Sequence, residues 1–385
     1  MGLRVGCGRA TCLPSSCLPK VSCKPRRTGP SSHAGEESRV GPRTMPMKPL
    51  VSILIPAYNA EEWIGDTLKS AIGQTWERKE IIVVDDGSTD HTLAIAQQFA
   101  SERVSVVTQD NQGAAAARNT AFSVSQGDYI QWLDADDLLA PDKVARQMEA
   151  VDQCGSKRTL LSSAWGRFMY RPYRAKFVPT ALWCDLPPVE WLLRKMGQNV
   201  FMQTATWLVS RELTETAGPW NTQLLVDNDG EYFCRVLLGC DGTRFIPEAR
   251  VFYRMSGFNC LSYIGRSERK MESQFLSVQL HIGYLRSLEN TERVRTACVK
   301  YLQNWLPSFY PERLDIVRQA EQLAATLGGR LEVPPPLSWK YAWIEKGFGW
   351  PLAKRAKIFL PQCRWSMIRS WDKTLSCLDS RSLAG

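Results

Sequence analysis

The acidic run Asp134-Ala135-Asp136-Asp137 directly follows the apolar segment 128–133. Hard divalent cations prefer oxygen ligands, and carboxylates one residue apart point in similar directions where a strand breaks into a turn. The run therefore predicts a site that holds Mn²⁺ or Mg²⁺ against a diphosphate. A solvated acidic turn, or a cap for a helix that opens at Pro141, is the structural alternative. The chain has only three His, so oxygen ligation is favoured over an imidazole metal site.

A second polar cluster, Asp85-Asp86-Gly87-Ser88, follows the apolar run 80–84. Gly87 permits a tight turn, and the start of the next helix offers free N–H groups. An aspartate at this place can accept hydrogen bonds from a base or a ribose. The alternative is helix capping by Ser88 or Thr89.

The run 111–119 combines small residues with an arginine, Arg118. Small residues let the backbone approach a ligand closely, and a guanidinium supplies a rigid fork of donors. A well-packed alanine helix with one surface arginine is the alternative. The chain contains neither G-x-G-x-x-G nor G-x-x-x-x-G-K-[ST], which disfavours a dinucleotide oxidoreductase and a P-loop NTPase.

Alternating strands and helices must position these clusters. Apolar β-branched runs predict buried strands, and 3.6-residue periodicity predicts helices between them. This alternation is typical of βαβ units with a parallel sheet. Because ligands lie at the carboxyl ends of such strands, the clusters after residues 56, 84 and 133 should converge. The predicted strands are 51–56, 80–84, 104–108 and 128–133, and the predicted helices are 61–74, 90–101, 113–125 and one opening at Pro141.

The pattern loosens after residue 155. A stiff linker is expected at 333–336, and in the tail beyond it Gly347, Gly349, Pro351 and Pro361 should break any long helix. The further predictions are strands at 159–170 and 204–210, two short strands within 243–254 around Pro247, and helices at 189–196, 229–239, 265–288, 290–303 and 311–327.

The net charge of +9 is concentrated at the two ends of the chain. Residues 1–48 carry nine Lys and Arg against two acidic residues, and residues 340–385 carry nine against three. The remainder is net −4, which disfavours nucleic acid as a partner because a phosphate-binding groove needs clustered Lys and Arg. The Trp-rich basic tail predicts either peripheral contact with an anionic membrane or an ordinary packing segment.

The first 44 residues lack apolar periodicity and the continuous apolar core of a signal peptide. We interpret them as an upstream extension with Met45 or Met47 as the start, the alternative being a flexible arm. The 12 Cys show no zinc-site spacing, and no apolar stretch approaches a transmembrane length. Reduced thiols and a cytoplasmic location, peripheral at most on the membrane, are expected.

Four segments together resemble the family 2 nucleotide-sugar glycosyltransferases. The resemblance is dense over residues 50 to about 150 and thinner in 218–254. It implies a GT-A fold, that is, an α/β fold with a Rossmann-like, mostly parallel sheet flanked by helices and followed by a C-terminal helical region. The segments are 51–59 with Glu61, 80–90, 111–119 and 127–137.

The resemblance also implies site residues. The donor, a nucleoside diphosphate sugar, would have its base and ribose held by Pro56, Ala57, Tyr58 and Glu61 with Asp85 or Asp86. Arg118 would lie near the nucleotide. Asp134 would approach the ribose or the metal, and Asp136 would bind the metal.

On the acceptor side, alignment on Arg235 places Asp229 as the general base. Asn228 stands where the family often has Glu, and this departure leaves Asp227 and Glu231 as rivals. An acceptor hydroxyl has a pKa far above 7 and needs such a carboxylate as it attacks. The family resemblance favours inversion at the anomeric carbon.

The expected activity is therefore transfer of a sugar to the hydroxyl of a sugar, lipid-linked or polysaccharide acceptor, in polysaccharide, lipopolysaccharide or glycoconjugate synthesis at the cell surface. The alternatives are an inactive GT-A-like binding protein and a sugar nucleotidyltransferase. The expected organisation is an N-terminal extension at 1–48, the catalytic domain at 49–260, a helical region at 261–332, and a linker with the basic tail at 333–385.

Overall fold

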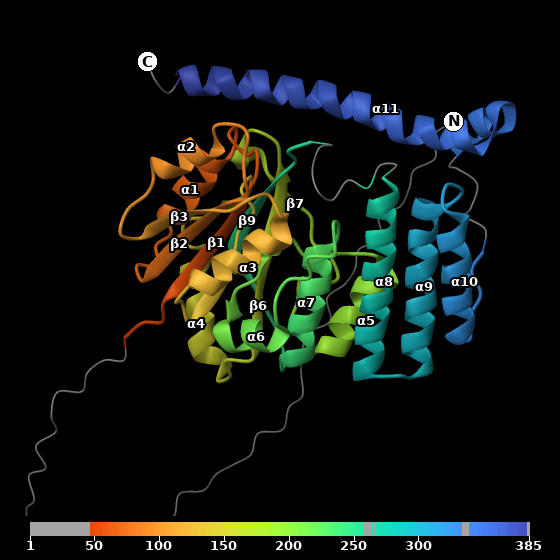
Figure 1. The fold of residues 1–385 in the computed structure, drawn as a ribbon, viewed down its shortest axis with the longest axis horizontal. Coiled ribbons are helices and arrows are strands. Elements are labelled where there is room, and N and C mark those ends of the chain that lie inside the picture. Colours follow the sequence, from red (N-terminus) through yellow and green to blue (C-terminus); the bar gives the residue numbers. More distant parts are fainter. Residues whose placement is uncertain (1–46, 258–263, 265–266, 333–338, 383–385) are drawn as a thin grey trace, which may run out of the picture. The chain divides into compact units, whose positions relative to one another are not determined.

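The computed structural model describes residues 47–257, 264, 267–332 and 339–382 (Figure 1). Its first sheet has the order β3-β2-β1-β4-β8. The first four of these strands are parallel neighbours, and β8 pairs with β4 in the antiparallel sense. The bounds are β1 (Val51–Ala57), β2 (Lys79–Asp85), β3 (Val104–Thr108), β4 (Tyr129–Trp132) and β8 (Val209–Ser210).

Helices cover this sheet, as the alternating pattern predicts. Every residue of β1 is buried, which explains its continuous apolar run. The alanines of α3 lie against β1 and β2 because their small side chains allow a close approach. The helices are α1 (Ile64–Ile72), α2 (Thr92–Gln97), α3 (Ala114–Val124) and α4 (Lys143–Cys154).

The start of α2 differs from the expectation. Neither Ser88 nor Thr89 caps it, and the helix begins only at Thr92. Asp90 accepts hydrogen bonds from the Thr92 N–H (2.9 Å) and from its hydroxyl. The hydroxyl of Ser88 instead accepts a bond from the backbone N–H of Asn59 at 3.0 Å, which ties two loops together.

A second sheet, of order β5-β9-β6-β7, follows. Its strands are β5 (Leu138–Leu139), β6 (Thr159–Phe168), β7 (Lys176–Phe177) and β9 (Gly242–Arg254). The expectation of two short strands around Pro247 is wrong, because β9 is one strand that runs parallel to β6. The register shifts where Ser163 pairs with Ile246 and Ala164 with Arg250, so Pro247 lies in a bulge where no ladder N–H is needed.

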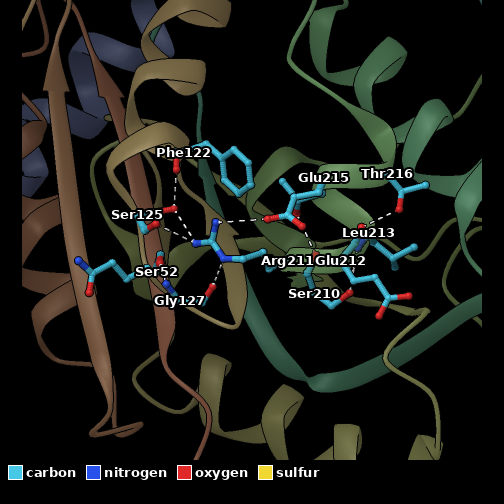
Figure 2. Close-up of polar contacts among 12 residues, drawn as sticks. Ser52, Phe122, Ser125, Gly127, Ser210, Arg211, Glu212, Leu213, Glu215 and Thr216 are labelled. Carbon is cyan, nitrogen blue, oxygen red and sulfur yellow. Dashed lines mark hydrogen bonds and ion pairs between the residues drawn. The ribbon is translucent and has the colours of Figure 1, made fainter.

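Arg211, the first residue of α6 (Arg211–Ala217), contacts the turn that precedes β4 (Figure 2). Its guanidinium donates to the carbonyl oxygens of Gly127 (2.7 Å) and Ser125 (3.0 Å) and lies 4.9 Å from the ring centroid of Phe122. Gly127 in turn donates its N–H to the hydroxyl of Ser52. The turn that leads into β4 is therefore fixed from both sides.

The remaining helices share one hydrophobic core with the sheets. Helix α7 lies against α8, and α5 lies against α9. The expected strand at 204–210 is only partly correct, because a 3₁₀ turn (Thr204–Thr206) precedes β8. The helices are α5 (Pro188–Gln198), α6 (Arg211–Ala217), α7 (Asn228–Gly239), α8 (Glu268–Leu288), α9 (Glu292–Phe309) and α10 (Leu314–Thr326), with a further 3₁₀ turn at Pro172–Arg174.

The tail forms α11 (Trp339–Ser382), contrary to the expectation that glycines and prolines would break it repeatedly. One break occurs, at Gly349, whose φ of 80° is left-handed. Pro351 follows where a second helical segment begins, a position that tolerates proline. None of the helices in the described ranges has the length and apolarity needed to cross a membrane. Residues 1–46 of the expected extension at 1–48 and the expected linker at 333–336 lie outside the described residues.

Candidate active site

The loops after β1 and β2 are bonded to each other at the carboxyl edge of the first sheet. The Asp86 N–H donates to the Ala57 carbonyl at 2.8 Å, and the Thr89 N–H donates to Asn59 Oδ1 at 2.8 Å. Gly87 has a φ of +71°, and a Cβ there would come within 2.9 Å of the Asn111 nitrogen. The edge is thus built from two loops that fix each other.

Asp85 and Asp86 have different surroundings, although both are buried. Asp86 accepts bonds from Gln109 Nε2 (2.7 Å) and from the N–H groups of Gln112 (2.9 Å) and Gly113 (2.8 Å), so its carboxylate fixes the start of α3. Asp85 Oδ2 accepts one bond from the Ser88 N–H, while its Oδ1 is buried with no partner in the described structure. An unpaired buried oxygen is costly, so Asp85 is the better candidate for receiving a donor group.

Four other predicted donor residues lie at the end of β1 or on the loop that follows it. Pro56 and Ala57 are buried in β1, and Tyr58 is half exposed at its end. Glu61 accepts bonds from the backbone N–H (2.9 Å) and Nδ1 (2.8 Å) of His91. These two bonds hold the pKa of Glu61 below its ordinary value. Glu61 therefore braces the loop before α2.

Arg118 projects from α3 and is almost fully buried. Its Nη2 donates to Asp134 Oδ1 at 2.6 Å, and its Nη1 lies 3.5 Å from Asn228 Oδ1 at the start of α7. The guanidinium also lies 4.4 Å from the ring centroid of Trp220. One side chain thus connects the end of β4 to the first residue of α7.

The three acids after β4 have separate surroundings. Asp137 is fully buried and accepts bonds from Gln203 Nε2 and from the Arg254 N–H (2.8 Å), so it serves the fold. Asp134 pairs with Arg118. Burial, followed by the charge of Asp134, raises the pKa of Asp136 to about 6. A hydrogen bond from Ser256 and the charge of Arg254 lower this pKa again, but they offset only part of the rise.

The acids at the start of α7 are distinguished by their partners. Glu231 is buried, pairs with Arg235 at 2.7 Å, and accepts a bond from the Tyr284 hydroxyl at 2.6 Å. Asp229 accepts a bond from Thr204 Oγ1 at 3.3 Å. Burial, and then the charge of Asp227, raise the pKa of Asp229, whereas Arg118 lowers it. The charges of Arg118 and Asp134, the pair at the end of β4, therefore both act on Asp229.

Asp227 belongs to a buried polar network between helices. It has a left-handed φ of 53° and accepts bonds from Ser277 Oγ (2.7 Å) and Gln274 Nε2 (3.3 Å) on α8. Burial alone would raise its pKa, but the charge of Lys195 and the hydrogen bonds from Ser277 and Gln274 bring the pKa of Asp227 below the ordinary value. His281 lies 3.0 Å from the Tyr301 hydroxyl and 3.9 Å from Asp227.

The sequence singles out Asn228 only as a departure from the family pattern, and it assigns no role in this region to Trp220, Lys195 or His281. Trp220 is fixed by Asn119, which donates to its carbonyl oxygen at 3.0 Å and accepts from its N–H at 2.7 Å. Asn119 lies in the motif 111–119, so its two bonds to Trp220 connect that motif to the segment before α7. No local signal identifies Lys195 or His281, because they reach Asp227 from α5 and α8.

In the described part of the chain, no group of three or more His, Cys, Asp or Glu side chains is arranged to hold a metal ion. A site for a divalent cation must therefore use fewer protein ligands. Mg²⁺ is commonly bound by one or two carboxylates together with substrate phosphates and water. Asp136, with Asp134 beside it, fits that donor set.

Residues 52–179 match the family model described as Glycosyl transferase family 2. A 105-residue segment is 47% identical to a Bacillus subtilis protein named as a candidate teichuronic acid biosynthesis glycosyltransferase, covering 26% of this chain and 42% of that protein. A segment of 111 residues is 42% identical to the chondroitin synthase of Escherichia coli, covering 28% of this chain and 16% of that protein. The matched segments therefore span less than half the length of these relatives.

Among solved structures, S. aureus TarS 1–349 in complex with UDP-GlcNAc superimposes with a TM-score of 0.52 at 19% identity, over 72% of this chain and 88% of that one. This likeness supports the fold alone. The α/β fold with its C-terminal helical region and the family expected from four motifs are both confirmed. The segment 52–179 is a family 2 glycosyltransferase segment, and the fold of the chain is GT-A.

Proposed function

We propose that this chain transfers a sugar from a nucleoside diphosphate sugar to an acceptor hydroxyl and inverts the anomeric carbon. The observation that carries the proposal is the position of Arg118 between Asp134 and Asn228. This arginine brings the acids after β4, on the donor side, next to Asp229 at the start of α7. Sugar transfer needs the group that stabilises the departing diphosphate and the base that accepts the acceptor proton on the two sides of the same anomeric carbon, so these acids must lie close together.

Asp85 is the proposed contact for the base or ribose of the donor. Its Oδ1 is buried with no partner among the described residues, so a donor N–H or O–H would satisfy it. Asp86 is assigned to the fold, because three donors from residues 109–113 already occupy its carboxylate. Of the two aspartates left open by the sequence, Asp85 is the one we assign to the donor.

Asp136 is the proposed ligand for Mn²⁺ or Mg²⁺, with Asp134 beside it. When bound, the cation would supply Lewis-acid stabilisation of the charge that develops on the departing diphosphate. The raised pKa of Asp136 supports the assignment, because a nearby cation would balance the charge that burial and Asp134 disfavour. Arg118 orients Asp134 toward this place.

Asp229 is the proposed general base. The acceptor oxygen forms a bond to the anomeric carbon while the bond from that carbon to the diphosphate oxygen breaks. The acceptor proton passes to the Asp229 carboxylate, and the nucleoside diphosphate leaves with the bonding electrons. A single displacement of this kind inverts the carbon. The pairing of Glu231 with Arg235 and Tyr284 and the bonds of Asp227 to α8 support Asp229 over these two rivals.

The acceptor proposed is a growing cell-surface polysaccharide or a related glycoconjugate. The names of two relatives, which refer to teichuronic acid and chondroitin, support this class and do not identify the sugar.

The test is release of nucleoside diphosphate from a panel of nucleotide sugars, with Mn²⁺ or Mg²⁺ and with EDTA. We expect one donor to be turned over and EDTA to abolish release. Asp136→Asn and Asp229→Asn should each lower kcat at least about a hundredfold. Asp152→Asn, which alters an exposed carboxylate on α4, is the matched control. Full activity in folded Asp136→Asn or Asp229→Asn protein would overturn the assignment.

A further inference from the structure

The second segment of α11 has an uncharged outer face. With 3.6 residues per turn, Leu352, Phe359, Met367, Trp371 and Leu378 fall within an arc of about 120° on the helix surface. None of the eight charged residues between positions 350 and 380 falls in that arc. The exposed fractions are 62% for Phe359 and 67% each for Met367 and Trp371. We call these five residues the outer face.

The opposite side of α11 is attached to the catalytic domain. Asp372 accepts bonds from the Tyr170 N–H (3.0 Å) and from Arg171 Nε (2.9 Å). Lys373 pairs with Glu62 at 2.6 Å. The guanidinium of Arg369 lies 5.6 Å from the ring centroid of Tyr170. The catalytic domain therefore does not cover the outer face, although α11 is bound to it.

Charge identifies the kind of partner that would cover the outer face. Arg355 and Arg364 are both exposed, and the helical projection places them about 40° and about 20° beyond opposite edges of the arc. The segment 340–385 carries nine Lys and Arg against three acidic residues. An apolar strip with aromatic side chains and cationic edges is complementary to an anionic lipid surface, into which the apolar side chains insert while the cations meet headgroup phosphates.

We propose that α11 binds the surface of anionic membranes through the outer face, with Arg355 and Arg364 at the lipid phosphates. The helix lies on the membrane and does not cross it. Because the other side of α11 is attached at Glu62, which adjoins Glu61 on the loop after β1, and at Tyr170, membrane binding would hold the catalytic domain at a bilayer. This proposal is independent of the sugar-transfer activity, since lipid binding needs neither donor nor acceptor.

The test is flotation of the full-length protein with vesicles of phosphatidylcholine alone or mixed with an equal amount of phosphatidylglycerol. We expect flotation with the mixed vesicles, weaker flotation with the neutral ones, and release by high salt. The triple variant Phe359→Ser/Met367→Ser/Trp371→Ser should bind the mixed vesicles at least about tenfold more weakly. The matched control is Val124→Ser/Val178→Ser/Leu314→Ser, which removes three exposed apolar side chains from other elements.

Two further measurements make the result decisive. Arg355→Glu/Arg364→Glu should reduce binding to the mixed vesicles and abolish the difference between the two lipid compositions. In the unaltered protein, hydrogen exchange at residues 352–378 should slow when mixed vesicles are added. The proposal is overturned if the unaltered protein does not float or if the Ser triple variant floats equally well. It is also overturned if light scattering without lipid shows a dimer that this variant dissociates, because a second copy would then be the partner.

Discussion

Two carboxylates two residues apart, Asp227 and Asp229, have pKa values shifted in opposite directions. Both are partly buried, and this burial raises the pKa of each. The charge of Lys195 and the hydrogen bonds from α8 more than offset this effect for Asp227, whose charge then acts on Asp229. The proposed base is thereby given a higher proton affinity than an ordinary aspartate, which strengthens it as a proton acceptor.

The activity should consequently fall on the acid side as Asp229 becomes protonated, at a pH above the ordinary aspartate pKa of 3.8. Asp227→Asn removes the like charge that raises the pKa of Asp229, so the acid limb of kcat/KM should move to lower pH. The measurement is a pH–rate profile of donor turnover for the unaltered protein and the variant.

Asp152→Asn, on the exposed face of α4, should leave the acid limb in place. Because Asp227 also balances buried Lys195, the profiles need to be recorded at a temperature where circular dichroism shows the variant to be folded. An unmoved limb in folded Asp227→Asn protein would contradict the proposed coupling between the two carboxylates.

The sequence predicts well those helices and strands whose formation depends on residues close together in the chain. The first four strands and their helices follow from periodicity within short windows, and β3 begins and ends at the predicted residues. The choice between Asp85 and Asp86 could not be made in this way, because the partners of Asp86 come from residues 109–113. The rivals of Asp229 were likewise separated only by partners on α5, α7 and α8.

The incorrect predictions have physical causes of the same kind. The pattern around Pro247 predicts two short strands, but a bulge in the pairing with β6 accommodates this proline within one strand. Pro351 was read as a helix breaker, but it follows the left-handed Gly349 at the start of a new helical segment. In both cases proline does interrupt the regular backbone, but the surrounding strand or helix accommodates the interruption.

The network around His281 connects α7, α8 and α9. Burial, and then the charge of Lys195, lower the pKa of His281 to about 4 from an ordinary 6.5. The unfolded chain therefore binds a proton at this residue between pH 6.5 and about 4 while the folded chain does not. The contribution of His281 to stability is present at higher pH and is lost as the pH falls through that window, by at most about 1.4 kcal/mol per pH unit.

His281→Gln should remove this contribution, so the free energy of unfolding of the variant should fall less steeply than that of the unaltered protein between pH 6.5 and pH 4.5. Urea unfolding at several pH values measures the two slopes, and their difference cancels the other titrating groups. Tyr301→Phe is the control, because it removes a hydroxyl partner at 3.0 Å and keeps the imidazole. It should lower stability by about 1 kcal/mol without changing the slope. Equal slopes for His281→Gln and the unaltered protein would refute the buried neutral imidazole.

The two sides of the long helix α11 have different partners. One side is attached to the catalytic domain by the ion pairs of Asp372 and Lys373. The other is the outer face, proposed to meet lipid. If the two sides act independently, a substitution on one of them should leave the property of the other unchanged.

Asp372→Ala tests this separation. The variant loses the carboxylate that accepts the Tyr170 N–H and pairs with Arg171 at 2.7 Å, both in a largely buried setting. Hydrogen exchange at Tyr170 should become roughly tenfold faster, since a net hydrogen bond contributes about 1 kcal/mol or slightly more. Flotation with anionic vesicles should stay as in the unaltered protein, because the outer face is intact. The variant Phe359→Ser/Met367→Ser/Trp371→Ser should show the reverse, with unchanged exchange at Tyr170 and lost flotation. If Asp372→Ala abolished flotation as well, lipid binding would depend on the attached side of the helix, and the outer face alone would not account for it.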